Sequence, residues 1–242
     1  GAVAIFATGC AGDINSGHSA KSSLSAQGNA DRSYEMAAHI GSGIAEAVMN
    51  CDLSALDHRC GVAEDRINLD FLSRETASPD MLIDQWNNLA HSDADKAFIY
   101  EIWIDWARKR MAIDIEPLEV RCTALYWGGS VLIGLPGEVF AQSALRLRDS
   151  IAREGMAAEC PVFLIAYADD NPGYIAPSAE YRFGGYEIDE AHRFYGLGAT
   201  FAPGSAEHLE QTGCLLAKNA AVAATQNQRA INNNTIERGN NG

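Results

Sequence analysis

The sequence predicts an α/β protein, and two kinds of segment carry that prediction. Three short apolar runs, at 2–7, 131–135 and 162–168, have the unbroken hydrophobicity of strands that are buried on both faces. Other segments, such as 34–49 and 140–151, repeat apolar residues at helical spacing. With 242 residues, 47% of them hydrophobic, the chain is long enough to bury one large core.

The first half of the chain begins with a strand and then becomes helical. The run at 2–7 predicts a central strand, and the Gly-, Asp- and Asn-rich segment at 10–20 predicts a loop. The helix expected at 34–49 carries two glycines that indicate close packing, and it places four apolar residues on one face: Ala37, Ile40, Ile44 and Val48. Two further helix starts are expected at Ser78 and Ser92. The second of these helices would turn five apolar residues into the core: Phe98, Ile99, Ile102, Trp103 and Trp106.

The second half predicts a hairpin, two helices and a further strand. Alternating polarity at 118–126 indicates a half-buried strand, and the glycines that follow it turn the chain back into the run at 131–135. A helix after Pro136 turns four apolar residues inward: Phe140, Ala144, Leu147 and Ile151. After the strand at 162–168, Ser205 would cap a last helix that ends near Lys218. The Asn-rich residues 221–242 predict a tail without regular structure.

Composition excludes several classes of function. The formal charge of −14, without a basic stripe, argues against nucleic acid as a partner. No apolar run is long enough to predict a membrane span, and the compartment stays undetermined. The six Cys form no CxxC; Cys122 and Cys160 fit a core, and a local bridge is open only for Cys51 and Cys60. The usual serine-nucleophile and phosphate-binding motifs are missing from the sequence.

Each of the three apolar runs leads into a polar loop, and we expect the three loops to meet. If the runs share a sheet and are parallel, their carboxyl ends lie at one edge, where α/β proteins bind ligands and metals. That edge would carry ten candidate residues: Asp13, Asn15, Ser16, His18, Glu138, Asp169, Asp170, Asn171, Tyr174 and Tyr186. The sequence therefore predicts a functional site at this edge, and Glu138 is the first candidate for chemistry.

Every candidate also has a structural interpretation that the sequence leaves open. Glu138 in the first turn of a helix would stabilise the positive end of the helix dipole. Asp13 and Asn15 beside glycine are typical of turns that bond their own backbone. The two acids after the third run are either solvated or, beside Asn171, suited to calcium or magnesium. The loop tyrosines also suit interface packing.

Three motifs give the chain a resemblance to a known family. In order they are FATGCAGDINS, GLPGEVF and GYIAPSAEYRFGGYE, and they fall within residues 2–210. With these motifs the chain resembles the catalytic domain of the neutral/alkaline non-lysosomal ceramidase superfamily, and especially its shorter bacterial members. The resemblance implies a large α/β (α+β) domain of layered sheets flanked by helices. Residues 1–220 would form its carboxyl-terminal half, and the other half would lie upstream or on a partner.

The resemblance also implies a zinc site. By this resemblance, the zinc ligands are Glu138 of the PGE motif and Tyr174 of the loop that follows the run at 162–168, which we call the late loop. Two further His ligands are expected upstream of residue 1. The six His of this sequence do not match the ligand positions of the family. Tyr186 would stabilise the oxyanion of the tetrahedral intermediate. Asp13 and Asn15 belong to the GDIN motif, in which Asn15 stands where the family has its reactive Ser, so ceramide is not the expected substrate.

The sequence thus predicts a zinc-dependent hydrolase of an amide or related C–N bond. Zinc-activated water would be the nucleophile, and the substrate would be a small molecule. The alternative is a non-catalytic relative that kept the scaffold and binds a small ligand or a carbohydrate. A homo-oligomer is a further possible assembly.

Overall fold

A four-stranded mixed sheet lies at the centre of the fold. The computed structural model describes residues 3, 5–14, 33–52, 56–73, 75–110, 115–156 and 160–239. The sheet has the strand order β1 (Cys60–Leu69), β3 (Leu118–Trp127), β4 (Ser130–Gly134) and β6 (Val162–Ile165). The first three strands are antiparallel neighbours, and β4 and β6 are parallel. This confirms the predicted hairpin and the mixed α/β class.

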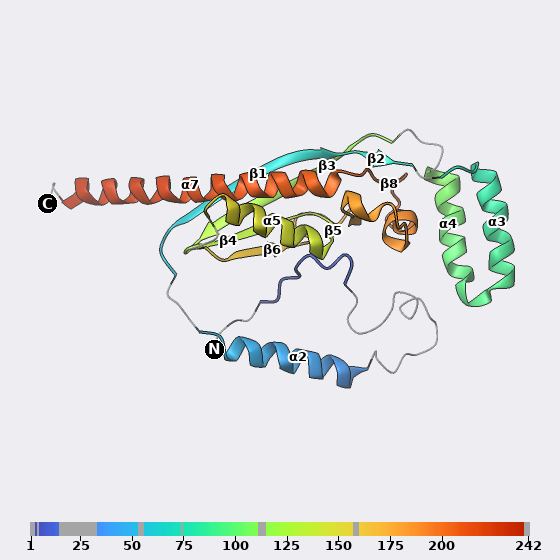
Figure 1. The fold of residues 1–242 in the computed structure, drawn as a ribbon, viewed down its shortest axis with the longest axis horizontal. Helices are drawn as coiled ribbons and strands as arrows, with labels where there is room; N and C mark the ends of the chain where they lie inside the picture. Colours follow the sequence, from blue (N-terminus) through green and yellow to red (C-terminus); the bar gives the residue numbers. More distant parts are fainter. Residues whose placement is uncertain are drawn as a thin grey trace.

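Two helices, α5 (Ala141–Arg153) and α7 (Ser205–Gly239), cover one face of this sheet (Figure 1). Three of the four predicted inward residues, Ala144, Leu147 and Ile151, lie on α5 and pack in one cluster with every second residue of β3. Phe140 precedes the helix and is buried in a separate cluster with Tyr181 and Ile188. Helix α7 contributes Leu209, Leu216 and a series of small residues that ends at Ala224, all of them buried. Alanines at such positions let a helix approach a sheet closely. The main core of the protein therefore lies between these two helices and the sheet.

The opposite face of the sheet carries an apolar row that the described residues leave open. The strand register places Val62 opposite Leu125, Leu125 opposite Leu132, and Leu132 opposite Phe163. Val62 and Phe163, at the two ends of the row, are 57% and 52% exposed. The expectation that the runs at 131–135 and 162–168 are buried on both faces is therefore wrong. Only alternate residues of β4 and β6 reach the core.

Two helices form a separate hairpin beyond one end of the sheet (Figure 1). They are α3 (Pro79–Ser92) and α4 (Ala97–Arg110), joined by a 3-10 turn at Ala94–Lys96. The hydroxyl of Ser78 accepts a hydrogen bond from the backbone N–H of Met81, as predicted for its cap. Ser92 instead ends α3, so the second predicted start is wrong. Trp106 and Ile99 are buried, whereas Phe98 and Ile102 are exposed because α4 turns Ile104 and Ala107 inward instead.

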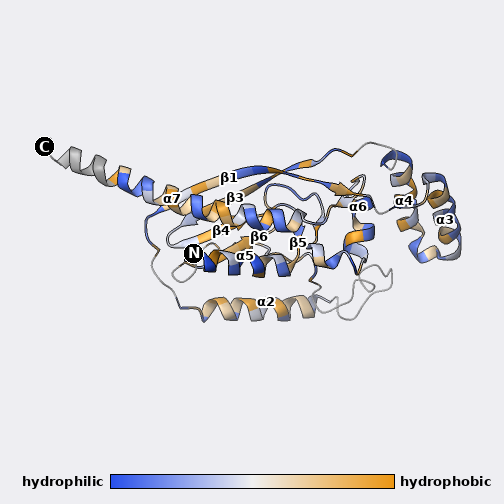
Figure 2. Ribbon diagram, turned by 45° about the horizontal axis from the view of Figure 1, so that its top comes forward, coloured by the Kyte–Doolittle hydropathy of each residue, from blue (hydrophilic) through white to orange (hydrophobic). Residues whose placement is uncertain are grey.

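Helix α2 (Tyr34–Met49) confirms the helix predicted at 34–49 but not its packing. Ser33 caps it by accepting a hydrogen bond from the N–H of Met36. None of its residues is buried, and the helix stands apart from the sheet (Figure 2). A Cβ added at Gly41 would meet no atom within 4 Å. The amphipathic pattern thus predicted the helix correctly, while the inferred neighbour is missing from the described residues.

The start of the chain forms no strand in the part that the structure describes. Residues 3 and 5–9 have no regular structure, and Val3, Ile5 and Phe6 are exposed. A hydrogen bond from the N–H of Ala166 to the carbonyl of Thr8 holds this segment at the end of β6. An unbroken apolar run needs strand neighbours on both sides to become a central strand, and none pairs with the described part of this run. Residues 3 and 5–7 therefore do not form the predicted strand.

The end of the chain is more regular than its composition suggests. Helix α7 continues past Lys218 to Gly239, so residues 221–239 are helical instead of forming a tail without structure. Burial of Ala220 and Ala224 against the sheet explains why this Asn-rich sequence begins as helix. All six cysteines are free, including Cys51 and Cys60, and Cys122 and Cys160 are buried as predicted. Among the described residues, no helix has the length and apolarity needed to span a membrane.

Candidate functional site

Two of the motifs meet in a short pair of parallel strands. After β4, the chain passes Pro136 and enters β5 (Glu138–Val139), which pairs with β7 (Tyr174–Ile175). The register places Glu138 directly opposite Tyr174, and the N–H of Glu138 donates to the carbonyl of Gly173 at 2.8 Å. Helix α5 begins only at Ala141, so Glu138 does not lie in its first turn. The dipole interpretation of Glu138 is therefore wrong, and the two predicted zinc ligands are neighbours.

Four tyrosines surround the carboxylate of Glu138. The hydroxyl of Tyr167 donates to Oε2 at 3.0 Å, and the hydroxyl of Tyr195 donates to Oε1. The ring of Tyr174 meets the rings of Tyr186 and Tyr195 edge-on, with centroids 5.8 Å and 6.2 Å apart. We call these five residues the Glu138 cluster. Both carboxylate oxygens thus have a phenol as a hydrogen-bond donor.

Burial and the charge of Glu138 keep these phenols protonated. Burial is the largest cause that raises the pKa of Tyr167 to about 12, followed by its hydrogen bond to Glu138. Burial and then Glu138 also raise the pKa of Tyr186, and they hold the pKa values of Tyr174 and Tyr195 well above the ordinary tyrosine range. At neutral pH the four phenols are therefore neutral hydrogen-bond donors. A phenolate ligand at Tyr174 would require a cation to offset this shift.

The backbone that presents Tyr167 is left-handed, with φ of 58° at Tyr167 and 68° at Asp169. Bulky residues rarely adopt this conformation, and it concentrates at functional sites. The N–H of Tyr167 donates to the carbonyl of Gly137 at 3.1 Å. The carboxylate of Asp169 pairs with Arg121 and accepts from the hydroxyl of Thr123, so Arg121 lowers the pKa of Asp169. Asp169 thus fixes the strained turn to β3.

The remaining polar residues of this loop bond the nearby backbone, and the side chain of Asn171 also forms a hydrogen bond with Tyr195. The carboxylate of Asp170 accepts from the N–H of Asn171 at 2.7 Å, and the side-chain oxygen of Asn171 accepts from the N–H of Gly173 at 3.3 Å. Gly173 has φ of 106°, and a Cβ there would lie 2.9 Å from the ring of Tyr195. These contacts shape the turn, and none of them brings Asp169 and Asp170 together as ligands of calcium or magnesium.

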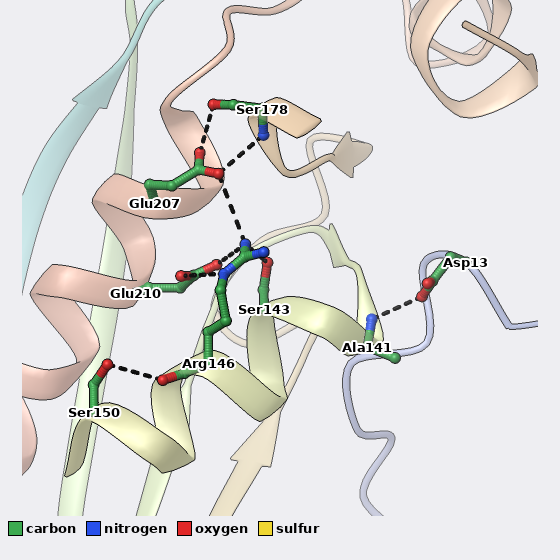
Figure 3. Close-up of polar contacts among 8 residues, drawn as sticks. All are labelled: Asp13, Ala141, Ser143, Arg146, Ser150, Ser178, Glu207 and Glu210. Atoms are coloured by element: carbon green, nitrogen blue, oxygen red, sulfur yellow. Dashed lines mark hydrogen bonds and ion pairs between the residues drawn. The ribbon is translucent and has the colours of Figure 1, made fainter. Parts of the chain in front are cut away.

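The first motif docks on β5 although it forms no strand. The N–H of Gly12 donates to the carbonyl of Val139 at 2.9 Å, and a Cβ at Gly12 would lie 2.5 Å from the carbonyl oxygen of Glu138. Only glycine allows this approach. Asp13 Oδ1 accepts from the N–H of Ala141 at 2.7 Å (Figure 3). Asp13 therefore caps α5, whose own cap residue Phe140 offers no side-chain acceptor.

The described parts of the three predicted loops thus meet at one edge, and the roles of their residues stay predictions. Asp13, Glu138, Tyr174 and Tyr186 all lie on segments that converge there, and Asp13 is bonded to the backbone of α5. Asn15, Ser16 and His18 lie outside the described residues. The catalytic roles expected of Asp13, Asn15 and Tyr186 are not tested by these contacts.

A charged network holds the late loop from its other side (Figure 3). Arg146 of α5 forms ion pairs with Glu210 at 2.5 Å and with Glu207 at 3.7 Å, both on α7. The carboxylate of Glu207 accepts from the N–H and the hydroxyl of Ser178, each at 2.9 Å. Ser178 begins a 3-10 turn (Ser178–Glu180) four residues after Tyr174. The loop that carries Tyr174 is therefore fixed to both core helices.

Two members of the Glu138 cluster were missing from our sequence-based site, Tyr167 and Tyr195. Tyr195 was visible as one of the loop tyrosines, but nothing in its spacing indicates a contact with Glu138. Tyr167 lies in the apolar run at 162–168, which we assigned to a strand. The sequence gives only a weak indication that Tyr167 belongs to the site. It lies at the end of an apolar run, just before two acids and Asn-Pro, a pattern that predicts a turn at this point.

The described residues offer two of the ligands of the predicted zinc site. A structural or catalytic zinc takes three or four protein ligands. Glu138 and Tyr174 provide two oxygen donors on adjacent strands, and their chemistry fits zinc once a cation lowers the pKa of the phenol. In the part of the chain that the structure describes, no group of three or more His, Cys, Asp and Glu is close enough to hold a metal ion. A zinc ion here would need further ligands, such as the two His that the resemblance implies.

Comparison with known proteins gives a distant likeness to ceramidases. No protein-family model and no curated protein matches the chain. The neutral ceramidase from Pseudomonas aeruginosa has a TM-score of 0.35 and 22% identity over 42% of this chain and 15% of its own. A ceramidase complexed with C2 has a TM-score of 0.33 and 21% identity over 41% of this chain and 14% of its own. The matched part is thus a small share of either ceramidase chain.

Proposed function

We propose that this protein is a zinc-dependent hydrolase that cleaves an amide or related carbonyl bond with metal-activated water. The observation that carries the proposal is the pairing of Glu138 with Tyr174 in the β5–β7 register. These two residues are the ligands that the ceramidase resemblance implies, and they come from motifs 36 positions apart (174 − 138). A strand pair that joins them at the end of β4 and β6 gives the resemblance a physical basis.

Glu138 and Tyr174 would hold the zinc together with two His from outside the sequence shown. A zinc bound there would supply a Lewis acid for the substrate carbonyl and lower the pKa of bound water toward about 7. Within the Glu138 cluster, Glu138 is the one acidic side chain, and it accepts hydrogen bonds from Tyr167 and Tyr195. The loops that carry both ligands are fixed by the turn at Tyr167 and by Glu207, so the donors are preorganised.

The remaining phenols would serve the substrate. When Glu138 binds a metal, its two phenol partners need another acceptor, and a carbonyl oxygen that gains negative charge is a good one. Tyr167 and Tyr195 have raised pKa values, so they are protonated donors at neutral pH. Tyr186, the predicted oxyanion donor, lies against Tyr174 and completes this group. We therefore assign oxyanion stabilisation to these hydroxyls.

Metal analysis of the complete natural chain tests the proposal. We expect about one zinc per chain in the wild type, as is usual for a single catalytic site. Glu138→Gln and Tyr174→Phe should each weaken zinc binding at least about tenfold, since even supporting residues of metal sites reach that effect. Tyr181→Phe is the matched control, because Tyr181 lies in the same loop but donates to the carbonyl of Phe201. A wild type without zinc, or two variants that retain zinc like the control, would refute the proposal.

A non-catalytic ligand-binding protein is the second candidate, and one observation favours it. Both oxygens of Glu138 already accept phenol hydroxyls, so the cluster is a satisfied polar group without a metal. A panel of N-acyl amides separates the two functions. Turnover that depends on zinc supports the hydrolase, whereas zinc binding without turnover supports the binding protein.

A further inference from the structure

The buried guanidinium of Arg193 lies two residues before Tyr195 in the late loop. Arg193 of α6 (Ala191–Phe194) is only 9% exposed. Its guanidinium carbon lies 5.3 Å, 4.7 Å and 5.4 Å from the ring centroids of Trp86, Trp103 and Trp106. These tryptophans belong to the α3–α4 hairpin, and the guanidinium also pairs with Glu75 just before α3. We call this group the Arg193 cluster.

The Arg193 cluster fixes α6 to the helical hairpin. Burying a guanidinium is costly unless charges and π faces replace water. Here three rings and one carboxylate face the guanidinium, and its Nε is buried without a hydrogen-bond partner among the described residues. A second set of contacts reinforces the same position. Trp106 Nε1 donates to the carbonyl of Leu197 at 2.6 Å, and the ring of Trp106 meets that of His192 at 5.3 Å. The backbone is therefore held on both sides of Arg193.

The next two residues, Phe194 and Tyr195, connect the Arg193 cluster with the Glu138 cluster. The ring of Phe194 lies 6.3 Å from that of Trp103 and 6.1 Å from that of Tyr186. Tyr195 then donates to Glu138 and packs against Tyr174. Arg193 and Tyr195 are only two residues apart, so the chain between them cannot absorb a large shift of either one. The aromatic contacts run without a gap from Trp103 to Tyr186.

We propose that Arg193 is a positioning residue that sets Tyr195 and Tyr186 in place at Glu138. The α3–α4 hairpin is then the support of the site, although no residue of the hairpin is placed at Glu138. The inference concerns the cluster assigned in the proposed function, but the tyrosine positions themselves do not depend on zinc. The same geometry would support a hydrolase or a ligand-binding protein.

Fluorine NMR of zinc-free protein labelled with 3-fluorotyrosine tests the inference. The eight tyrosines each give a resonance, which Tyr→Phe variants assign. Arg193→Lys keeps the charge but loses the planar group that stacks on the three rings. We expect it to shift the resonances of Tyr195 and Tyr186 and to leave that of Tyr126, on β3, unchanged. A general loss of structure would move all eight instead.

A matched control and a second variant keep the test decisive. Arg59 stacks on the ring of Tyr126 with 5.2 Å to the centroid, so Arg59→Lys should move only Tyr126. If Arg193→Lys does not fold, Trp103→Phe replaces it, because this change reduces the nearest ring of the cluster. Unchanged resonances of Tyr195 and Tyr186 in a folded variant would overturn the inference. Zinc content plays no part in the measurement, so its outcome is independent of the proposed function.

Discussion

The Glu138 cluster and the Arg193 cluster use aromatic side chains around opposite charges in different ways. Glu138 is only half-buried, and its carboxylate accepts hydrogen bonds from the hydroxyls of Tyr167 and Tyr195. Arg193 is buried, and the faces of three tryptophans close around it. The carboxylate of Glu138 can exchange its phenol donors for another ligand. The tryptophan rings stacked on Arg193 cannot leave it unless α3 and α4 move. The comparison indicates a hydrogen-bonded, half-buried charge in one cluster and a structural charge in the other.

The largest expected effect lies in the Arg193 cluster. Trp106→Ala should destabilise the protein by about 3–5 kcal/mol, the usual cost of removing a buried tryptophan. Trp127→Ala is the matched control, because Trp127 is 53% exposed at the end of β3. Its cost should be well below that of the buried ring. Urea unfolding of both variants measures the difference, and equal costs would break the structural assignment of this cluster.

The pH dependence of stability should come from His192, whose ring packs against Trp106 of the Arg193 cluster. Burial lowers the pKa of His192 from 6.5 to about 4, so the folded state holds a neutral imidazole that the unfolded state protonates first. The stability due to this difference is present above pH 6.5 and is lost as the pH falls toward 4. The loss is at most about 3 kcal/mol. Urea unfolding of wild type and His192→Gln measures it across this interval.

The variant should be less sensitive to acid than the wild type in that interval. Asp169 has a lowered pKa and adds its own loss at lower pH in both proteins, so it cancels in the comparison. Parallel curves for the two proteins would show that His192 does not titrate as its burial implies.

A smaller effect is expected when the charge of the Glu138 cluster is removed. Glu138→Gln should lower the pKa of Tyr167 from about 12, because the negative charge no longer opposes ionisation of the phenol. Burial is the largest cause of the shift, so the pKa should stay above 10.0. Absorbance of the phenolate, compared with a Glu138→Gln/Tyr167→Phe double variant, isolates this tyrosine. A rise in the pKa would contradict the account of the cluster.

The smallest effect is expected beneath the Glu138 cluster, at Asp13. Asp13→Ala removes the acceptor that caps α5 and should cost about 1 kcal/mol. Asp13→Asn keeps an acceptor oxygen and should cost less. Thermal unfolding of the two variants makes the measurement. If the variants retain full stability but lose activity, Asp13 belongs to the chemistry, as the sequence first suggested.

Much of the site could be predicted because its geometry follows from strand ends. The apolar runs that became β4 and β6 are parallel neighbours, so the residues that follow them had to share an edge. That reasoning brought Glu138 and Tyr174 together correctly. It failed for Tyr167, because this residue adopts a left-handed turn conformation after the strand. Such a turn does not show in the pattern of apolar residues. Tyr195 was missed because its position depends on contacts with α3 and α4, far away in the sequence.

The fold shows the same division between local and distant information. Ser78 and the hairpin at 118–134 were predictable from neighbouring residues alone. The apolar segments at 2–7 and 34–49 were assigned to buried positions that the described residues do not provide. An apolar pattern reports that a face prefers burial, and it does not report which segment covers that face. Burial is therefore the property that the sequence predicted least well.

The cap that Asp13 places on α5 has a consequence for the order of folding. The contact spans 128 residues, and the entropy of closing so long a loop must be overcome before the contact gains anything. Local pairs such as the β3–β4 hairpin and the α3–α4 hairpin close much shorter loops. We therefore expect the segment around Gly12 to dock late, onto a β5 that is already formed. In pulsed hydrogen exchange, the amide of Gly12 should gain protection after the amides of β3 and β4.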